Sequence, residues 1–219
     1  MLNFSRYLVS RARVTAALAI TCIVVFGLEA IGSTSYDALL GTGRRLSPVL
    51  AFGVVFRPAI DAGEWWRLIT AGFLHFGAIH LLLNLYALVY VGVALEPRFG
   101  SKRFAGIYLA ALVGGNLAAY QFQSPQTFSA GASGAIMGMF GAMALIGLRY
   151  LSGRQQWIWL QSAVFPIVAT LAFGFSQPNI SNAAHIGGLL CGFVAASLLG
   201  VSPDWKRLLA AQQRATGAP

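Results

Sequence analysis

One stretch decides the fold, and it reads SAGASGAIMGMFGA from Ser129 to Ala142. It places a serine, Ser133, among glycines at the beginning of a long uncharged segment of small residues. Small residues let membrane helices pack closely. A serine without bulky neighbours can also be approached by a substrate backbone, provided that a histidine elsewhere accepts its proton. The rest of the sequence decides whether this stretch is a helix-packing motif or carries a nucleophilic serine.

The composition indicates a polytopic, all-α membrane protein. Of the 219 residues, 57% are hydrophobic and only 10% are charged, and the mean hydropathy is +0.69. A soluble domain of this length could not bury so much apolar surface. The net charge of +9 does not indicate a nucleic-acid partner, because the basic residues are scattered over short loops without interleaved aromatic residues. Cys22 and Cys191 lie in separate apolar segments and predict neither a disulfide nor a metal site.

Apolar runs predict six transmembrane helices. We place them at 14–31, 78–95, 104–121, 133–150, 157–173 and 183–200. A basic lead before the first run is also typical of a signal peptide. This run is longer than the apolar region of such a peptide and no small-residue cleavage site follows it, so we expect it to be retained. The predicted layout is a short cytoplasmic segment at 1–13, a membrane domain at 14–200 and a cytoplasmic basic tail at 201–219.

The longest stretch without a spanning pattern covers residues 32–77. Loops of this length rarely lack structure of their own, so we expect short helices that lie at the membrane interface. The run Glu64-Trp65-Trp66-Arg67 favours this position, because tryptophan and arginine prefer the headgroup level.

The distribution of lysine and arginine predicts that both termini lie in the cytoplasm. On one side, only the long loop contributes basic residues, and these are Arg44, Arg45, Arg57 and Arg67. All the other lysines and arginines fall in the N-terminal lead, in the loops of the opposite side or in the tail. The positive-inside rule places that richer side in the cytoplasm. We expect a cell membrane protein, bacterial by its short tails, with the uncharged loops at 122–132 and 174–182 outside.

Polar side chains from three predicted helices converge near the outer face. The fourth and sixth helices run in the same direction, so Ser133 and His185, at their beginnings, lie at similar depth. The second helix runs the same way and carries His80 and Asn84 four residues apart, on one face. A nucleophile and its base need such a placement, and the His80–Asn84 pair could stabilise an oxyanion.

These residues belong to an ordered set that resembles the rhomboid family of intramembrane serine proteases. The set is Trp66-Arg67, His75-x4-His80-x3-Asn84, Gly131-Ala132-Ser133-Gly134 and Ala184-His185-Ile186-Gly187-Gly188. A Gly-x-Ser-Gly motif alone occurs by chance in many proteins, whereas the ordered set, over about residues 60–200, is specific.

The resemblance implies a six-helix rhomboid-like bundle that cleaves transmembrane segments of membrane protein substrates. Ser133 would be the nucleophile and His185 its general base, with no essential third carboxylate and no metal or organic cofactor. His80 and Asn84 would line the oxyanion site with the Ser133 N–H group, beside Gly131.

The resemblance also gives other residues supporting roles. Trp66-Arg67 would be structural, and Gly187-Gly188 would let the sixth helix press against the fourth. Many members carry an aromatic residue four positions after the serine, where Met137 stands here, so a thioether would contact the histidine instead. From the residues themselves, we expect a structural hydrogen bond for His75 and, because charge is absent and Pro178 is present, a mobile outer cap after Ser176, at residues 177–179.

Alternative interpretations stay open. Ser133 alone also fits a packing serine, and His185 alone fits an interhelical hydrogen bond. The alternative function is a catalytically silent rhomboid-like protein that binds membrane clients, although silent members usually lack the dyad. A transporter would need paired intramembrane charges or a repeat, and the sequence has neither. Glu96 and Arg98 predict a local ion pair or cap, and the basic tail predicts contact with anionic lipid.

Overall fold

The protein is a bundle of long helices, as the composition predicted. The computed structural model describes residues 12–31, 51, 53–177 and 180–216. The long helices are α2 (Arg13–Ile31), α7 (Ala78–Phe99), α8 (Ser101–Phe122), α9 (Ser133–Tyr150), α10 (Gly153–Ser176) and α11 (Asn182–Leu199). Shorter elements are α5 (Arg57–Asp61), α6 (Arg67–Thr70), the 3₁₀ helix η1 (Ala71–Phe73) and α12 (Pro203–Thr216). Each predicted span coincides with one long helix, and most of these helices extend a few residues beyond the predicted boundaries.

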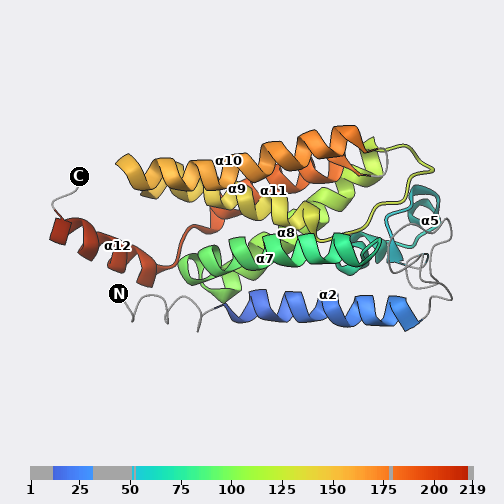
Figure 1. Ribbon diagram of the computed structural model, residues 1–219, viewed down its shortest axis with the longest axis horizontal. Helices are drawn as coiled ribbons and strands as arrows, with labels where there is room; N and C mark the ends of the chain where they lie inside the picture. The colour runs from blue at the N-terminus through green and yellow to red at the C-terminus, as the bar shows by residue number, and fades with distance from the viewer. Residues whose placement is uncertain (1–11, 32–50, 52, 178–179, 217–219) are drawn as a thin grey trace.

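The long helices run side by side, with α2 at one edge of the bundle and α10 at the other (Figure 1). The segment with α5 lies at one end and α12 at the other, and we call these the α5 end and the α12 end. Five helices in the described residues are long and apolar enough to cross a membrane, and these are α2, α7, α9, α10 and α11. The sixth, α8, is more polar, with Asn116 along its length. It packs against α2, α7, α9 and α11, and Asn116 is buried.

Glycines let α11 lie directly against both α8 and α9. A Cβ atom added to Gly138 of α9 would lie 2.6 Å from the carbonyl oxygen of Gly188. A Cβ atom added to Gly115 of α8 would lie 2.8 Å from the carbonyl oxygen of Ala184. The predicted Gly187-Gly188 contact is therefore divided between two neighbours, since Gly188 meets α9 whereas Gly187 meets α8. Such close backbone contact is how small residues hold membrane helices together.

A buried carboxylate fastens α2 to the bundle at the α12 end. Glu96 of α7 is fully buried and accepts hydrogen bonds from the Val14 and Thr15 backbone N–H groups, at 2.9 and 2.8 Å. The hydroxyl groups of Thr15 and Ser101 also donate to it, at 2.8 and 2.7 Å. Glu96 therefore caps the beginning of α2, where backbone N–H groups lack partners inside the helix.

The predicted ion pair between Glu96 and Arg98 is wrong, whereas the predicted cap is correct but belongs to α2. The Arg98 guanidinium lies over the Trp159 ring, 4.5 Å from its centroid, and donates to the carbonyl oxygen of Ala94. An aromatic face attracts a cation without a carboxylate partner.

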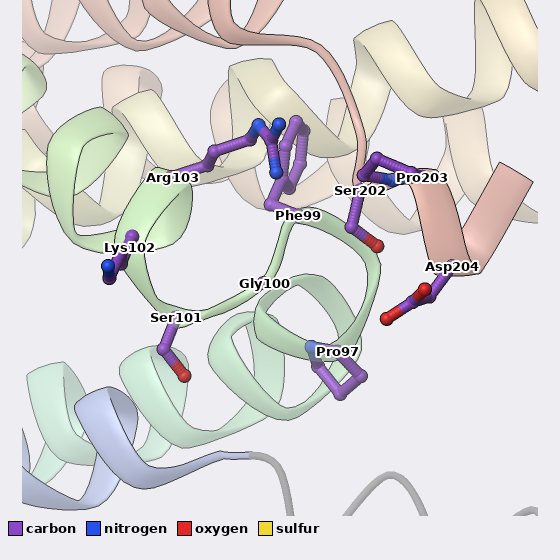
Figure 2. A pocket seen from close by; sticks show the side chains of 9 residues that line it. All are labelled: Pro97, Phe99, Gly100, Ser101, Lys102, Arg103, Ser202, Pro203 and Asp204. Atoms are coloured by element: carbon purple, nitrogen blue, oxygen red, sulfur yellow. The ribbon is translucent and has the colours of Figure 1, made fainter.

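The tail helix α12 is attached to the bundle through its first turn. Trp205 is buried and meets Tyr150 edge-on, with ring centroids 5.8 Å apart. The Ser202 N–H group donates to the Arg98 carbonyl oxygen at 2.8 Å. A shallow pocket lies where the turn around Gly100 meets the beginning of α12 (Figure 2). The basic residues of this helix, including Lys206, are exposed, and their contact with anionic lipid stays a prediction.

Arg67 fixes the segment that leads to α7. Its side chain is buried, pairs with Glu64 at 2.6 Å, and donates to the carbonyl oxygens of Ala51 and Val54, at 2.8 and 3.0 Å. The short helices expected between residues 32 and 77 are found at α5, α6 and η1, and residues 32–50 and 52 lie outside the described residues. Trp66 is exposed, but Arg67 does not reach outward to a headgroup, because the loop's carbonyl groups need its N–H groups.

Candidate active site

Ser133 and His185 meet at the α5 end of the bundle. Ser133 is the first residue of α9, and His185 lies one turn into α11. The His185 Nε2 atom lies 2.9 Å from the Ser133 Oγ atom, within hydrogen-bond distance. This proximity follows from the glycine contacts between α9 and α11, because a Cβ atom on Gly134 would lie 3.3 Å from the Ala184 carbonyl oxygen. Ser133 and His185, which were predicted to lie at similar depth, are therefore in direct contact.

The environment of His185 orients the ring without a carboxylate. Ser181 caps α11 by accepting a hydrogen bond from the Ala184 N–H group at 3.2 Å, which fixes the turn that carries His185. The His185 side chain is buried, and its Nδ1 atom has no hydrogen-bond partner among the described residues. The part of the chain that the structure describes also holds no group of three potential metal ligands. Within the described part of the chain, Ser133 is the side chain to which the buried imidazole bonds.

The backbone around Ser133 can accept negative charge. As the first residue of α9, Ser133 lies where helix N–H groups have no partner within the helix and the helix dipole is positive. Gly131 precedes it with φ +125°, a conformation that other residues rarely adopt. The Gly131 N–H group donates to the Ala71 carbonyl oxygen at 2.9 Å, which ties this turn to η1.

His80 borders the same space from α7. A Cβ atom added to Gly131 would lie 2.9 Å from the His80 Nε2 atom and 3.8 Å from the Ser133 Oγ atom. The Phe76 N–H group donates to the His80 Nδ1 atom at 3.3 Å. Because Nδ1 accepts this bond, the proton of neutral His80 is on Nε2, which is then a donor at the edge of the site. Asn84 lies one turn further along α7, where its amide donates to the His80 carbonyl oxygen at 2.9 Å.

His75 contributes its backbone to the site's surroundings. Its N–H group donates to the Glu29 carboxylate at 3.3 Å, whereas both nitrogen atoms of its ring lack partners among the described residues. The expected structural hydrogen bond of the His75 side chain is therefore not found within the described ranges, and only the backbone of this residue makes one there. Burial, and to a smaller extent the nearby His80, lowers the pKa of the His75 imidazole to about 3, so the ring is neutral at physiological pH. The rings of His75 and His80 meet edge-on, with centroids 5.2 Å apart.

The sequence interpretation missed Glu29 as a neighbour of the site. The available signal was an acidic residue near the end of an otherwise apolar run, where a charge is expensive. Met137 is buried one turn after Ser133, and its contact with the histidine stays a prediction. Residues 178 and 179 of the expected cap lie outside the described residues.

A membrane helical bundle with a serine–histidine pair at one end defines the class of this protein. A sequence model of the Rhomboid domain matches residues 62–202, and the chain belongs to the rhomboid family. The chain is similar to Rhomboid protease GluP of Bacillus subtilis, with 42% identity over 200 residues that cover 89% of this chain and 36% of that protein. It is 37% identical over 150 residues to RHOMBOID-like protein 6, mitochondrial, of Arabidopsis thaliana, covering 68% of this chain and 48% of that protein.

A more distant relative is Rhomboid-like protease 3 of Toxoplasma gondii, which is 27% identical over 198 residues that cover 88% of this chain and 73% of that protein. The chain thus spans only 36% and 48% of the lengths of the bacterial and Arabidopsis relatives.

Proposed function

We propose that this protein is an intramembrane serine endopeptidase that cleaves transmembrane segments of membrane protein substrates. The observation that carries the proposal is the 2.9 Å separation of the Ser133 Oγ and His185 Nε2 atoms, two helices apart in the chain. A serine is a weak nucleophile until a neighbouring base accepts its proton, and this contact supplies the base. Family membership and the names of the protease relatives support the same activity.

The proposed reaction has two steps. His185 takes the Ser133 hydroxyl proton while the serine oxygen bonds to the substrate carbonyl carbon, and the imidazolium then gives the proton to the leaving amine. The oxyanion between these events is met by the Ser133 N–H group, by the His80 Nε2–H group and by the Asn84 amide. Water then attacks the acyl-enzyme, with His185 again as base, and releases the second product. Ser133 is half-buried at the α5 end, which supports water entry from that side.

The distribution of basic residues supports a proposed orientation in the membrane. The exposed lysines and arginines of α12, with Lys102 at the start of α8, gather at the α12 end. We propose that this end and both termini face the cytoplasm and that Ser133 lies near the opposite surface. The layout proposed is a segment at 1–13, the membrane domain at 14–200 and the tail at 201–219.

The test is cleavage of a single-span model substrate in liposomes by wild type, Ser133→Ala and His185→Ala. Ser197→Ala is the matched control, because this serine also lies in the membrane but bonds only to the Phe193 carbonyl oxygen of its own helix, at 2.9 Å. We expect wild type and the control to cleave and the two dyad variants to lose at least about 10³-fold in rate. Equal cleavage by all four proteins would contradict the dyad. Binding of the substrate by wild type without cleavage would favour the silent alternative.

A further inference from the structure

Glu29 is a carboxylate in an unfavourable place. It lies in the last turn of α2, where the helix dipole disfavours negative charge, and the residue is 4% exposed. The buried residues of α2 are Thr15, Cys22 and Glu29, which are seven residues apart and therefore share one face of the helix. Glu96 already fastens this face at the α12 end. A second buried acid at the α5 end therefore requires a separate reason.

The hydrogen bonds around Glu29 lead directly to His80. The Glu29 carboxylate accepts from the His75 N–H group at 3.3 Å, and the next N–H group, that of Phe76, donates to the His80 Nδ1 atom at 3.3 Å. Two consecutive backbone groups thus connect the acid of α2 to the imidazole of α7. Val25 of α2 also packs against this segment, in a cluster that includes Leu74 and Phe76.

We propose that Glu29 is a positioning residue that acts through the 74–77 segment and keeps the His80 proton on Nε2. With His75 held by Glu29, the Phe76 N–H group stays directed at Nδ1, so that His80 presents its Nε2–H group to the space beside Gly131. This inference rests on the proposed function, in which that group meets the oxyanion. It concerns a helix outside residues 62–202, the range that matches the Rhomboid domain.

A simple anchoring role for Glu29 predicts a different outcome. An anchor would change the stability of the bundle but not the position of one proton on His80. Glu29→Gln keeps an oxygen that accepts the His75 N–H bond, whereas Glu29→Met has similar length and no comparable acceptor. Glu29→Met also removes a polar group from an apolar helix, so this variant is compatible with a folded bundle. Glu29→Ala is a second variant without an acceptor for the His75 N–H group. Cys22→Ala is the matched control, because Cys22 is buried on the same face of α2.

The first measurement does not depend on proteolysis. The tautomer of His80 is read by NMR of protein labelled with ¹⁵N-histidine, with signals assigned from His75→Asn and His80→Asn variants. We expect one Nε2–H tautomer of His80 in wild type, Glu29→Gln and Cys22→Ala, and a mixture of tautomers in Glu29→Met and Glu29→Ala. An unchanged tautomer in both of the latter variants would overturn the proposal.

The second measurement separates kcat from KM for the model substrate. We expect Glu29→Met to lower kcat about tenfold with KM unchanged, because the lost donor acts on the transition state. Glu29→Gln should stay within about twofold of wild type. In the His80→Ala background, Glu29→Met should have no further effect, and additive losses would overturn the proposal. If wild type cleaves nothing while the tautomer still shifts, the proposed function fails and the positioning role stands.

Discussion

At the scale of the residue, Gly131 has little freedom to change. Its φ of +125° disfavours any side chain, and a Cβ atom would lie 2.8 Å from the His80 Cε1 atom. We expect Gly131→Ala to lower the free energy of unfolding by about 1–3 kcal/mol and to reduce cleavage at least about 100-fold, because the methyl group occupies the space beside His80. Unfolding in detergent and cleavage in liposomes measure the two effects.

The control for this substitution is Gly63→Ala. Gly63 has a similar φ of +103°, but apart from its chain neighbours no residue in the described ranges lies within 4 Å of its Cβ position. It should lose stability through backbone strain alone and keep its activity. If Gly131→Ala cleaves as well as Gly63→Ala does, the space beside His80 is not used by the substrate.

The sequence identified the polar residues of the site better than it identified their partners. Ser133, His185, His80 and Gly131 gather as expected, because helix order and direction already placed them at one depth. The partner of Glu29 could not be predicted, because it is a backbone N–H group in a loop. Every residue except proline has such a group, so the sequence pattern does not show which one Glu29 meets. The burial of Arg67 was unpredictable for the same reason, since its partners are the backbone carbonyl groups of Ala51 and Val54.

At the scale of the element, the α9–α11 contact sets the distance between the serine and the histidine. A methyl group on Gly188 would overlap the carbonyl group of Gly134. We expect Gly188→Ala to destabilise the bundle by about 1–3 kcal/mol through overpacking and to lower kcat, because α11 must move away from α9 with His185. Thermal unfolding and steady-state kinetics measure both effects.

Gly27→Ala is the matched control for this helix contact. Gly27 is also a glycine inside a long helix, α2, but no described residue outside its own turn of helix lies within 4 Å of its Cβ position. Its substitution should leave stability and cleavage near the wild-type values. An equal loss in both variants would mean that helical glycine itself, and not the α9–α11 contact, is required.

Helix existence was predictable from apolar runs, and the boundaries of α2, α9 and α11 agree with the predicted spans to within about one residue, whereas those of α7, α8 and α10 do not. The expected span at 157–173 is observed as Gly153–Ser176, and the span at 78–95 continues to Phe99 through Pro97. Polar residues at the helix ends continue the helical hydrogen bonding beyond the apolar run. A prediction from hydropathy alone therefore places these helix ends too close to the helix centre. The contact of each glycine with a particular neighbour was also beyond prediction, because it depends on helix rotation.

At the scale of the whole molecule, Glu96 is the buried acid that attaches α2 at the α12 end. We expect Glu96→Ala to lower the free energy of unfolding by about 3 kcal/mol, since it leaves the N–H groups of Val14 and Thr15 and the hydroxyl groups of Thr15 and Ser101 without an acceptor. Denaturation in detergent measures the loss. Asp204→Ala is the control, because Asp204 is an exposed acid at the same end. Similar stabilities of the two variants would contradict the capping role.

The Glu96 cap also has a consequence for synthesis. The Thr15 N–H group bonds to a carboxylate 81 residues later in the chain. At about 5–20 residues per second, the ribosome needs about 4–16 seconds to make that intervening length. During this time α2 is in the membrane without its acceptor, so nascent chains that end before Glu96 should carry an α2 that can be extracted or digested, and longer chains should protect it.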